Sequence, residues 1–133
     1  MKQIFKLGLA AFLVLGSGSL SAERKERKTQ GFGSESAHAP PAAREWRNPY
    51  AGQPDAVLAG KKLYARHCAQ CHAEDGRGRG KALDLRSPPV QDAPSGVLFW
   101  YLKNGNIRKS MPSWSRLPDQ QLWQLVSFLQ TPR

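Results

Sequence analysis

The chain has 133 residues and is poor in cysteine, in methionine and in acidic side chains. Its only cysteines are Cys68 and Cys71, so none stands near residue 22 to carry a lipid anchor, and a lipoprotein is excluded. No alternation of apolar and polar residues predicts a strand or a hairpin, and no internal repeat is visible. The length favours one small domain without room for a large active-site cavity. We therefore expect a small all-α protein.

Basic residues outnumber acidic ones two to one. The chain has 20 Lys and Arg against 10 Asp and Glu, which gives a formal net charge of +10. Because Lys2 and Lys6 carry two of these charges, the chain beyond residue 22 keeps +8. We expect such a protein to dock on acidic protein surfaces or anionic lipid, since electrostatic steering raises association rates. Nucleic acid is not an expected partner, because no nucleic-acid-binding motif is present.

Residues 1–22 have the order of a secretory signal peptide. Lys2 and Lys6 precede an apolar run over residues 7–15, and small residues follow up to Ala22. The run is shorter than the ~20 residues that span a bilayer, and a charged segment comes directly after it. We expect cleavage near Ala22 and a periplasmic protein with no stable membrane span. A retained membrane anchor is the alternative.

The composition divides the chain into three parts. We expect a signal peptide over residues 1–22, a flexible arm over residues 23–53 and a folded domain over residues 54–133. The arm is charged and rich in Ser, Gly, Ala and Pro, with few large apolar side chains to bury. Trp46 and Tyr50 are its exceptions, and they either fold back against the domain or stay within the arm.

Three helices are expected in the domain from apolar spacing and from residues that favour helix ends. Their expected ranges are residues 55–68, 95–104 and 118–130. Between the first two helices, Gly76, Gly78 and Gly80 alternate with basic residues, a composition that favours tight turns. Two cysteines and a histidine, Cys68, Cys71 and His72, lie where we expect the first helix to meet this irregular stretch.

Cys68, Cys71 and His72 form the pattern Cys-x-x-Cys-His. Two thiols at this spacing can add to the two vinyl groups of a haem while the imidazole reaches the iron. A zinc site would need two more ligands, and only His38 and His67 remain, which we expect at the surface. A redox dithiol normally accompanies a βαβ context, which is missing, and a structural disulfide is the other alternative. The pattern predicts one haem c, held covalently by both cysteines, with His72 on the iron.

Met111 is the candidate for the second axial ligand, because it is the only methionine beyond residue 22. Pro112 restricts Met111 to extended conformations, which predicts a stiff loop that presents the thioether. The alternative is a core methionine, but Met111 lies between Ser110 and Pro112 rather than on an apolar helix face. Ligation by His72 and Met111 leaves no open position on the iron and raises the reduction potential, so an electron carrier is expected rather than an enzyme.

With these motifs, residues 54–129 resemble the class I cytochrome c family, especially its short bacterial single-haem members and the haem domains of larger oxidoreductases. The matching elements are Gly60-Lys-Lys-Leu-Tyr64, Cys68-Ala-Gln-Cys71-His72, Asp75-Gly76-Arg77-Gly78, Met111-Pro112 and Leu125-Val-Ser-Phe128-Leu129. The resemblance implies a small all-α cytochrome c fold, with three to four helices around one covalently bound haem.

The resemblance also implies particular contacts. Gly60 and Phe128 are expected to touch where the first and last helices cross, because glycine has no Cβ. Pro88 or Pro89 is expected to supply the carbonyl that orients the proximal imidazole. The sequence departs from the family after His72 and before Met111, where it has Ala73 and Ser110 in place of the frequent glycine.

The function expected from these features is one-electron transport in the periplasm by a single haem c. The first alternative is a haem c subunit or module of a dehydrogenase or terminal oxidase complex. The second, of another class, is a haem enzyme or gas sensor with a labile sixth ligand. Basic residues near both motifs predict a docking ring for an acidic redox partner, or else a solvated basic surface. They are Arg77, Arg79, Lys81, Arg108, Lys109 and Arg116.

Overall fold

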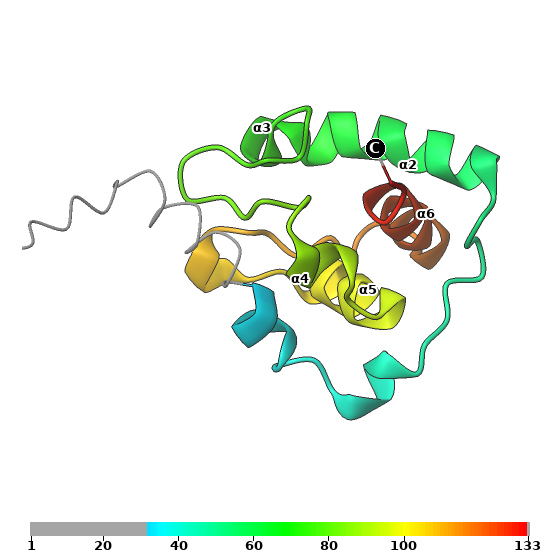
Figure 1. Ribbon diagram of the computed structural model, residues 1–133, viewed down its shortest axis with the longest axis horizontal. Coiled ribbons are helices and arrows are strands. Elements are labelled where there is room, and N and C mark those ends of the chain that lie inside the picture. Colours follow the sequence, from blue (N-terminus) through cyan, green and yellow to red (C-terminus); the bar gives the residue numbers. More distant parts are fainter. Residues whose placement is uncertain (1–31, 133) are drawn as a thin grey trace, which may run out of the picture.

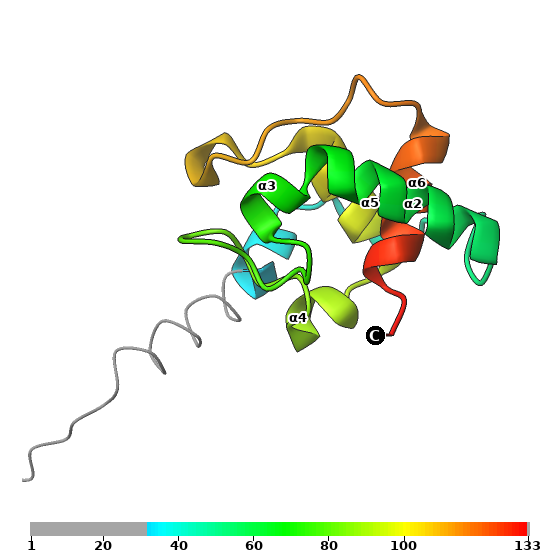
Figure 2. The same cartoon turned by 90° about the horizontal axis from the view of Figure 1, so that it is seen from above.

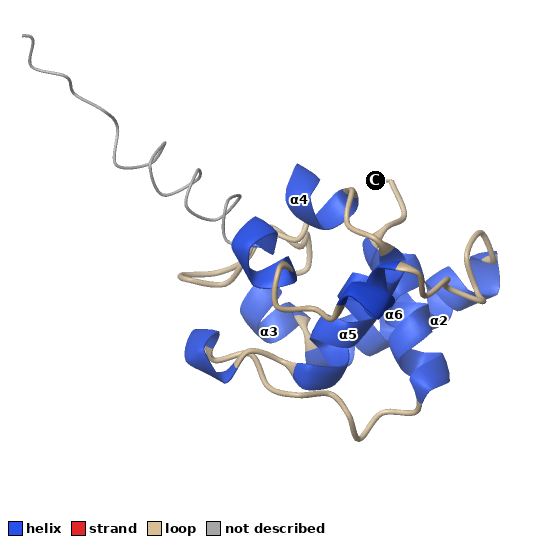
Figure 3. Ribbon diagram, turned by 90° about the horizontal axis from the view of Figure 1, so that it is seen from below, coloured by secondary structure: helices blue, strands red, loops and turns tan. Residues whose placement is uncertain are grey.

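The computed structural model describes residues 32–132 (Figure 1), so the predicted signal peptide over residues 1–22 lies outside the described residues. Three helices form the frame: α2 (Pro54–His67), α5 (Ser95–Asn104) and α6 (Asp119–Leu129). Shorter turns lie between and before them: η1 (Pro41–Arg44), α3 (Ala69–His72), α4 (Pro88–Gln91) and η2 (Ile107–Lys109). Figure 3 shows helices joined by loops and no strand in this part of the chain. The expected small all-α fold is confirmed.

Helix α2 crosses α6 in the most extensive helix contact of the structure (Figure 2). At the crossing, a Cβ added to Gly60 would overlap the backbone carbonyl of Gln124 and lie 2.8 Å from Phe128 Cβ. The rings of Tyr64 and Phe128 lie beside it, with centroids 5.2 Å apart. The predicted contact between Gly60 and Phe128 is therefore confirmed, because only glycine lets the two backbones approach this closely.

Helix α6 supplies much of the core. The negative charge of Asp119, in the first turn, stabilises the helix by its attraction to the positive end of the helix dipole. Leu122, Leu125, Val126 and Leu129 are buried at the spacing of one helix face. Helix α5 packs against the same cluster with its buried Val97 and Leu98 and with Phe99, whose ring stacks on Trp123 at 4.1 Å.

The prediction of a flexible arm is wrong for residues 32–53, and residues 23–31 lie outside the described residues. Phe32 is only 2% exposed and packs edge-on against Tyr101, with ring centroids 5.3 Å apart. Ala43 is fully buried beneath Gly96, where any Cβ would overlap the Ala43 carbonyl. Trp46 folds back against Phe99 of α5 at 6.0 Å. A few apolar side chains hold the segment, because each one meets an aromatic or a glycine of α5.

Asn48 ties the end of this segment to α6. Its amide nitrogen donates to the Trp123 carbonyl at 3.2 Å and to Ser127 Oγ at 2.9 Å. Its side-chain oxygen accepts from the backbone N–H of Tyr50 at 2.9 Å. The chain between η1 and α2 is therefore fixed by hydrogen bonds to a helix that lies more than 70 residues away in sequence. No helix between residues 32 and 132 has the length and apolar character needed to cross a membrane.

Candidate haem site

The Cys-x-x-Cys-His motif lies on the turn that continues α2 into α3. The backbone N–H of Cys68 donates to the Tyr64 carbonyl at 2.8 Å, and that of His72 donates to the Cys68 carbonyl at 2.9 Å. Helical spacing therefore puts Cys68 and His72 on one face of the turn. Neither Cys68 nor Cys71 forms a disulfide; Cys68 is half-buried and Cys71 is exposed. Both thiols are free for a covalent attachment.

The surroundings of Cys68 disfavour thiolate chemistry. Burial raises the pKa of its thiol from 9.0 to about 11, and the nearby Cys71 adds to the rise. A redox dithiol needs a lowered thiol pKa, so the raised pKa disfavours that alternative. Among residues 32–132, no three His, Cys, Asp or Glu side chains are grouped to hold a metal ion. A thioether, which carries no charge, suits this half-buried position better than either alternative.

The ring of His72 is held by one hydrogen bond that leaves its other nitrogen available. Nδ1 lies 3.0 Å from the carbonyl oxygen of Leu83. Because a carbonyl only accepts, Nδ1 carries the proton and Nε2 keeps its lone pair, which is the form that binds iron. Burial lowers the pKa of His72, against the opposing effect of the Leu83 bond, and so favours the neutral ring.

The carbonyl that orients His72 comes from Leu83, so the expectation that Pro88 or Pro89 supplies it is wrong. Both prolines begin the short helix α4 instead. The loop after His72 folds back over α3: the N–H of Gly78 donates to the His72 carbonyl at 2.8 Å. Gly78 has a φ of +77°, and a Cβ there would overlap the Ala82 carbonyl, so this return path depends on glycine. The path brings Leu83 to the ring before the chain reaches the prolines.

Ala73 and Ser110 are the two non-glycine residues with positive φ between residues 32 and 132, at 62° and 60°. Ala73 directly follows His72, and Ser110 directly precedes Met111. Ala73 has a ψ of 165°, a combination that glycine adopts and that costs other residues about 1–3 kcal/mol. The buried hydroxyl of Tyr64 donates to the Ala73 carbonyl at 2.6 Å and fixes this turn. The two departures from the family pattern thus lie at strained turns beside both candidate ligands.

The loop of Met111 is closed by a backbone pair with Asn106. The N–H of Asn106 donates to the Met111 carbonyl at 2.8 Å, and the N–H of Met111 donates back at 2.9 Å. Met111 is half-buried and packs against the core cluster. Figures 1 and 2 both place α3 and the yellow-orange turn η2 at the same end of the molecule. The helix that ends at His72 and the turn that comes just before Met111 therefore lie at one end of the fold.

The donors and their surroundings fit a haem c. Two free thiols, a neutral imidazole with Nε2 available and a thioether are the groups that such a haem uses. Half-buried apolar side chains packed on the core include Cys68, Leu83, Leu85, Trp100, Tyr101, Met111 and Trp114. Sequence reasoning missed Leu83, because nothing in its local sequence marks its carbonyl as a partner of His72.

The two remaining histidines take no part in this arrangement. His38 is exposed, as expected. His67 is half-buried rather than at the surface, and its ring packs on Trp114 with centroids 5.1 Å apart.

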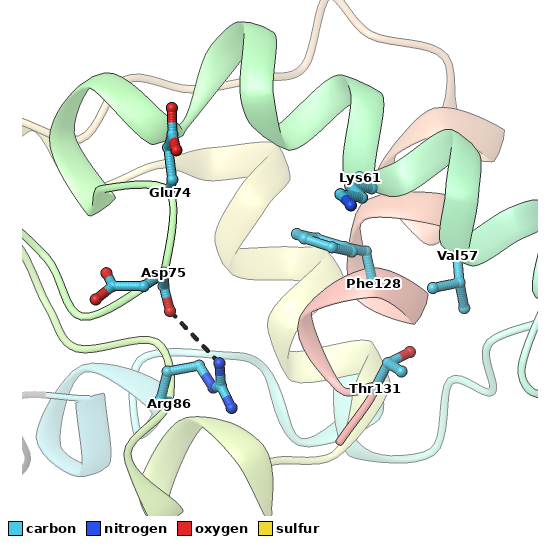
Figure 4. A pocket seen from close by; sticks show the side chains of 7 residues that line it. All are labelled: Val57, Lys61, Glu74, Asp75, Arg86, Phe128 and Thr131. Carbon is cyan, nitrogen blue, oxygen red and sulfur yellow. Dashed lines mark hydrogen bonds between the residues drawn. The ribbon is translucent and has the colours of Figure 1, made fainter. Parts of the chain in front are cut away.

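A separate hollow of about 410 Å³ lies between α2, the loop after α3 and the end of α6 (Figure 4). It is lined by Val57, Lys61, Glu74, Asp75, Arg86, Phe128 and Thr131. Across it, Arg86 donates to the Asp75 carbonyl at 3.5 Å. None of the four predicted haem-binding residues lines this hollow, so it is not the haem site.

The fold and the donors at its end define the class of protein, a c-type haem protein. Residues 55–129 match the family described as cytochrome c oxidase, cbb3-type, subunit III. Cytochrome c550 of Pseudomonas aeruginosa is 31% identical over 104 residues, covering 68% of this chain and 70% of that protein. No solved structure matches. The chain belongs to the class I monohaem c-type cytochromes, an electron-transfer family.

Proposed function

We propose that this cytochrome is a one-electron carrier with one haem per chain, attached through Cys68 and Cys71 and ligated by His72 and Met111. The observation that carries the proposal is the orientation of His72, whose Nδ1 bond to Leu83 leaves Nε2 available. Cys68, Cys71, His72 and Met111 would hold the haem, which when bound would supply one-electron chemistry at its iron. The chain's part is to hold both ligands, to exclude water with apolar side chains and to keep the iron closed to substrates, so no enzyme activity is expected.

The test is an optical spectrum of the exported, haem-loaded protein, compared with Met111→Ala. Haem that survives acid–acetone extraction, and a ferric methionine–iron charge-transfer band seen only in the wild type, would support the proposal. Haem loss on extraction would refute covalent attachment. Absence of the band from the wild type, with carbon monoxide binding by the reduced protein, would favour the haem enzyme or gas sensor instead.

The site of action under this proposal is the periplasm, reached through cleavage near Ala22. The order of charge, apolar run and small residues in residues 1–22 supports export. Mass spectrometry of the periplasmic fraction tests it: a mature chain beginning near residue 23 with the mass of one haem is expected. A full-length chain in the membrane fraction would favour a retained anchor.

The docking surface under this proposal surrounds the exposed turn η2. Arg108 and Lys109 are exposed in this turn, and Ile107 beside them is 85% exposed; Arg116 is exposed in the chain after Met111. Arg77, Arg79 and Lys81 are exposed in the loop after α3. Basic charge around an exposed apolar side chain suits an acidic redox partner.

The docking proposal predicts that the rate of electron transfer to an acidic redox protein falls steeply with rising salt. Lys109→Glu should slow the reaction at low salt, because it reverses a charge on the docking surface. The matched control, Lys62→Glu, reverses an exposed charge on α2 instead. A flat response to salt, or equal effects of the two variants, would contradict the docking surface.

A second candidate is a haem c subunit of a terminal oxidase complex. It is favoured by the matched family, whose description names subunit III of a cbb3-type cytochrome c oxidase. Purification under native conditions separates the two: the carrier elutes as a small haem protein by itself, and the subunit elutes with an oxidase.

A further inference from the structure

The position of Met111 depends on Asn106, because the loop between them has little support of its own. Residues 107–110 are exposed throughout, and Ile107 is 85% exposed. The two backbone hydrogen bonds between Asn106 and Met111 close this loop at its base. Whatever fixes Asn106 therefore fixes the residue that the proposed function places on the iron.

The side chain of Asn106 is held by Glu35, from a segment far away in sequence, and by Tyr101, five residues before it. Its amide nitrogen donates to Glu35 Oε2 at 2.5 Å and to the Tyr101 hydroxyl oxygen at 2.9 Å. These bonds use both of the hydrogens that the amide group offers. The bond to the carboxylate is charge-assisted and is the stronger of the two. All three side chains are half-buried, which weakens competition from water.

Glu35 is in turn held in place by its neighbours. Residues 32–36 form a short helical stretch. Phe32, one turn before Glu35, is buried edge-on against the ring of Tyr101. Burial raises the pKa of Tyr101, and the nearby carboxylate of Glu35 raises it further. The segment predicted to be a free arm thus reaches the base of the Met111 loop, 71 residues away in sequence.

We propose that Glu35 is a positioning residue for Met111, acting through the side chain of Asn106. The carboxylate orients the Asn106 amide, and the Asn106 backbone holds Met111 in the conformation in which its thioether serves as the axial ligand. This inference rests on the proposed function, because it takes Met111 as the ligand of a bound haem.

The test uses imidazole as a competitor for the Met111 position on the ferric protein. Glu35→Ala should bind imidazole about tenfold more tightly than the wild type, equivalent to about 1.4 kcal/mol, and should show a weaker methionine–iron charge-transfer band. Glu35→Gln keeps an oxygen that accepts from Asn106, so its affinity should stay within about threefold of the wild type. Glu45→Ala, an exposed carboxylate of the same segment, is the control and should change neither readout.

A comparison of single and double variants at Glu35 and Asn106 tests the same role by imidazole affinity, even if one variant is unstable. If Glu35 acts through Asn106, the pair Glu35→Ala and Asn106→Ala should bind imidazole no more tightly than Asn106→Ala alone. Additive effects, or an unchanged affinity in Glu35→Ala, would overturn the role of Glu35. A wild type that lacks the methionine–iron band would instead overturn the proposed ligation by Met111, so the two failures are distinguishable.

Discussion

Replacing Ala73 by glycine should stabilise the folded cytochrome, although glycine usually destabilises. Ala73 has φ 62° and ψ 165°, and the Tyr64 hydroxyl holds its carbonyl at 2.6 Å. Relief of the strain at such a backbone position contributes about 1–3 kcal/mol. The larger unfolded-state entropy of glycine offsets about 0.5–1 kcal/mol of this. The net gain in the free energy of unfolding is about 0–2.5 kcal/mol.

The assay is denaturant unfolding of the oxidised, haem-loaded protein, followed by helical circular dichroism. Ala65→Gly is the matched control, because Ala65 is an exposed residue inside α2 with ordinary helical geometry. It should lower the free energy of unfolding by about 1 kcal/mol. Opposite signs for the two substitutions are the expected result. If Ala73→Gly destabilises as much as Ala65→Gly, the backbone at Ala73 is not strained.

Two further predictions concern packing. Gly60→Ala should lower the free energy of unfolding by about 3 kcal/mol, because the added Cβ would overlap the Gln124 carbonyl. The control is Ala59→Gly, which adds no atoms and should lower the free energy of unfolding by only about 1 kcal/mol in the same denaturant assay. Phe32→Ala should cost about 3 kcal/mol and expose residues 32–53 to limited proteolysis; protection equal to wild type would contradict the docking of this segment.

Much of the fold could be predicted from local patterns in the sequence. The helix expected over residues 95–104 is α5, and those expected over residues 55–68 and 118–130 differ from α2 and α6 by only one residue at each end. The contact between Gly60 and Phe128 also followed from the family pattern. These features depend on residues three or four positions apart, or on a single missing Cβ, and such signals are present in the sequence itself.

Two features could not be predicted, because they depend on the path of the chain in space. Composition indicated a free arm over residues 23–53, yet Phe32 and Ala43 are buried against α5. A composition average gives little weight to two or three apolar side chains, and the aromatic and glycine residues that receive them lie far along the chain. The family pattern suggested Pro88 or Pro89 as the partner of His72, yet the return of the loop at Gly78 brings Leu83 there first.

The sequence by itself determined the three long helices, the class of protein and the four candidate haem-binding residues, because thiols, imidazole and thioether are recognised by residue type and spacing. Only the tertiary structure decided which backbone carbonyl orients His72 and which carboxylate reaches Asn106. Any residue has a carbonyl, and any of several acidic side chains could have been the partner. Their roles depend on which groups the folded chain brings within hydrogen-bonding distance, and no local pattern records that distance.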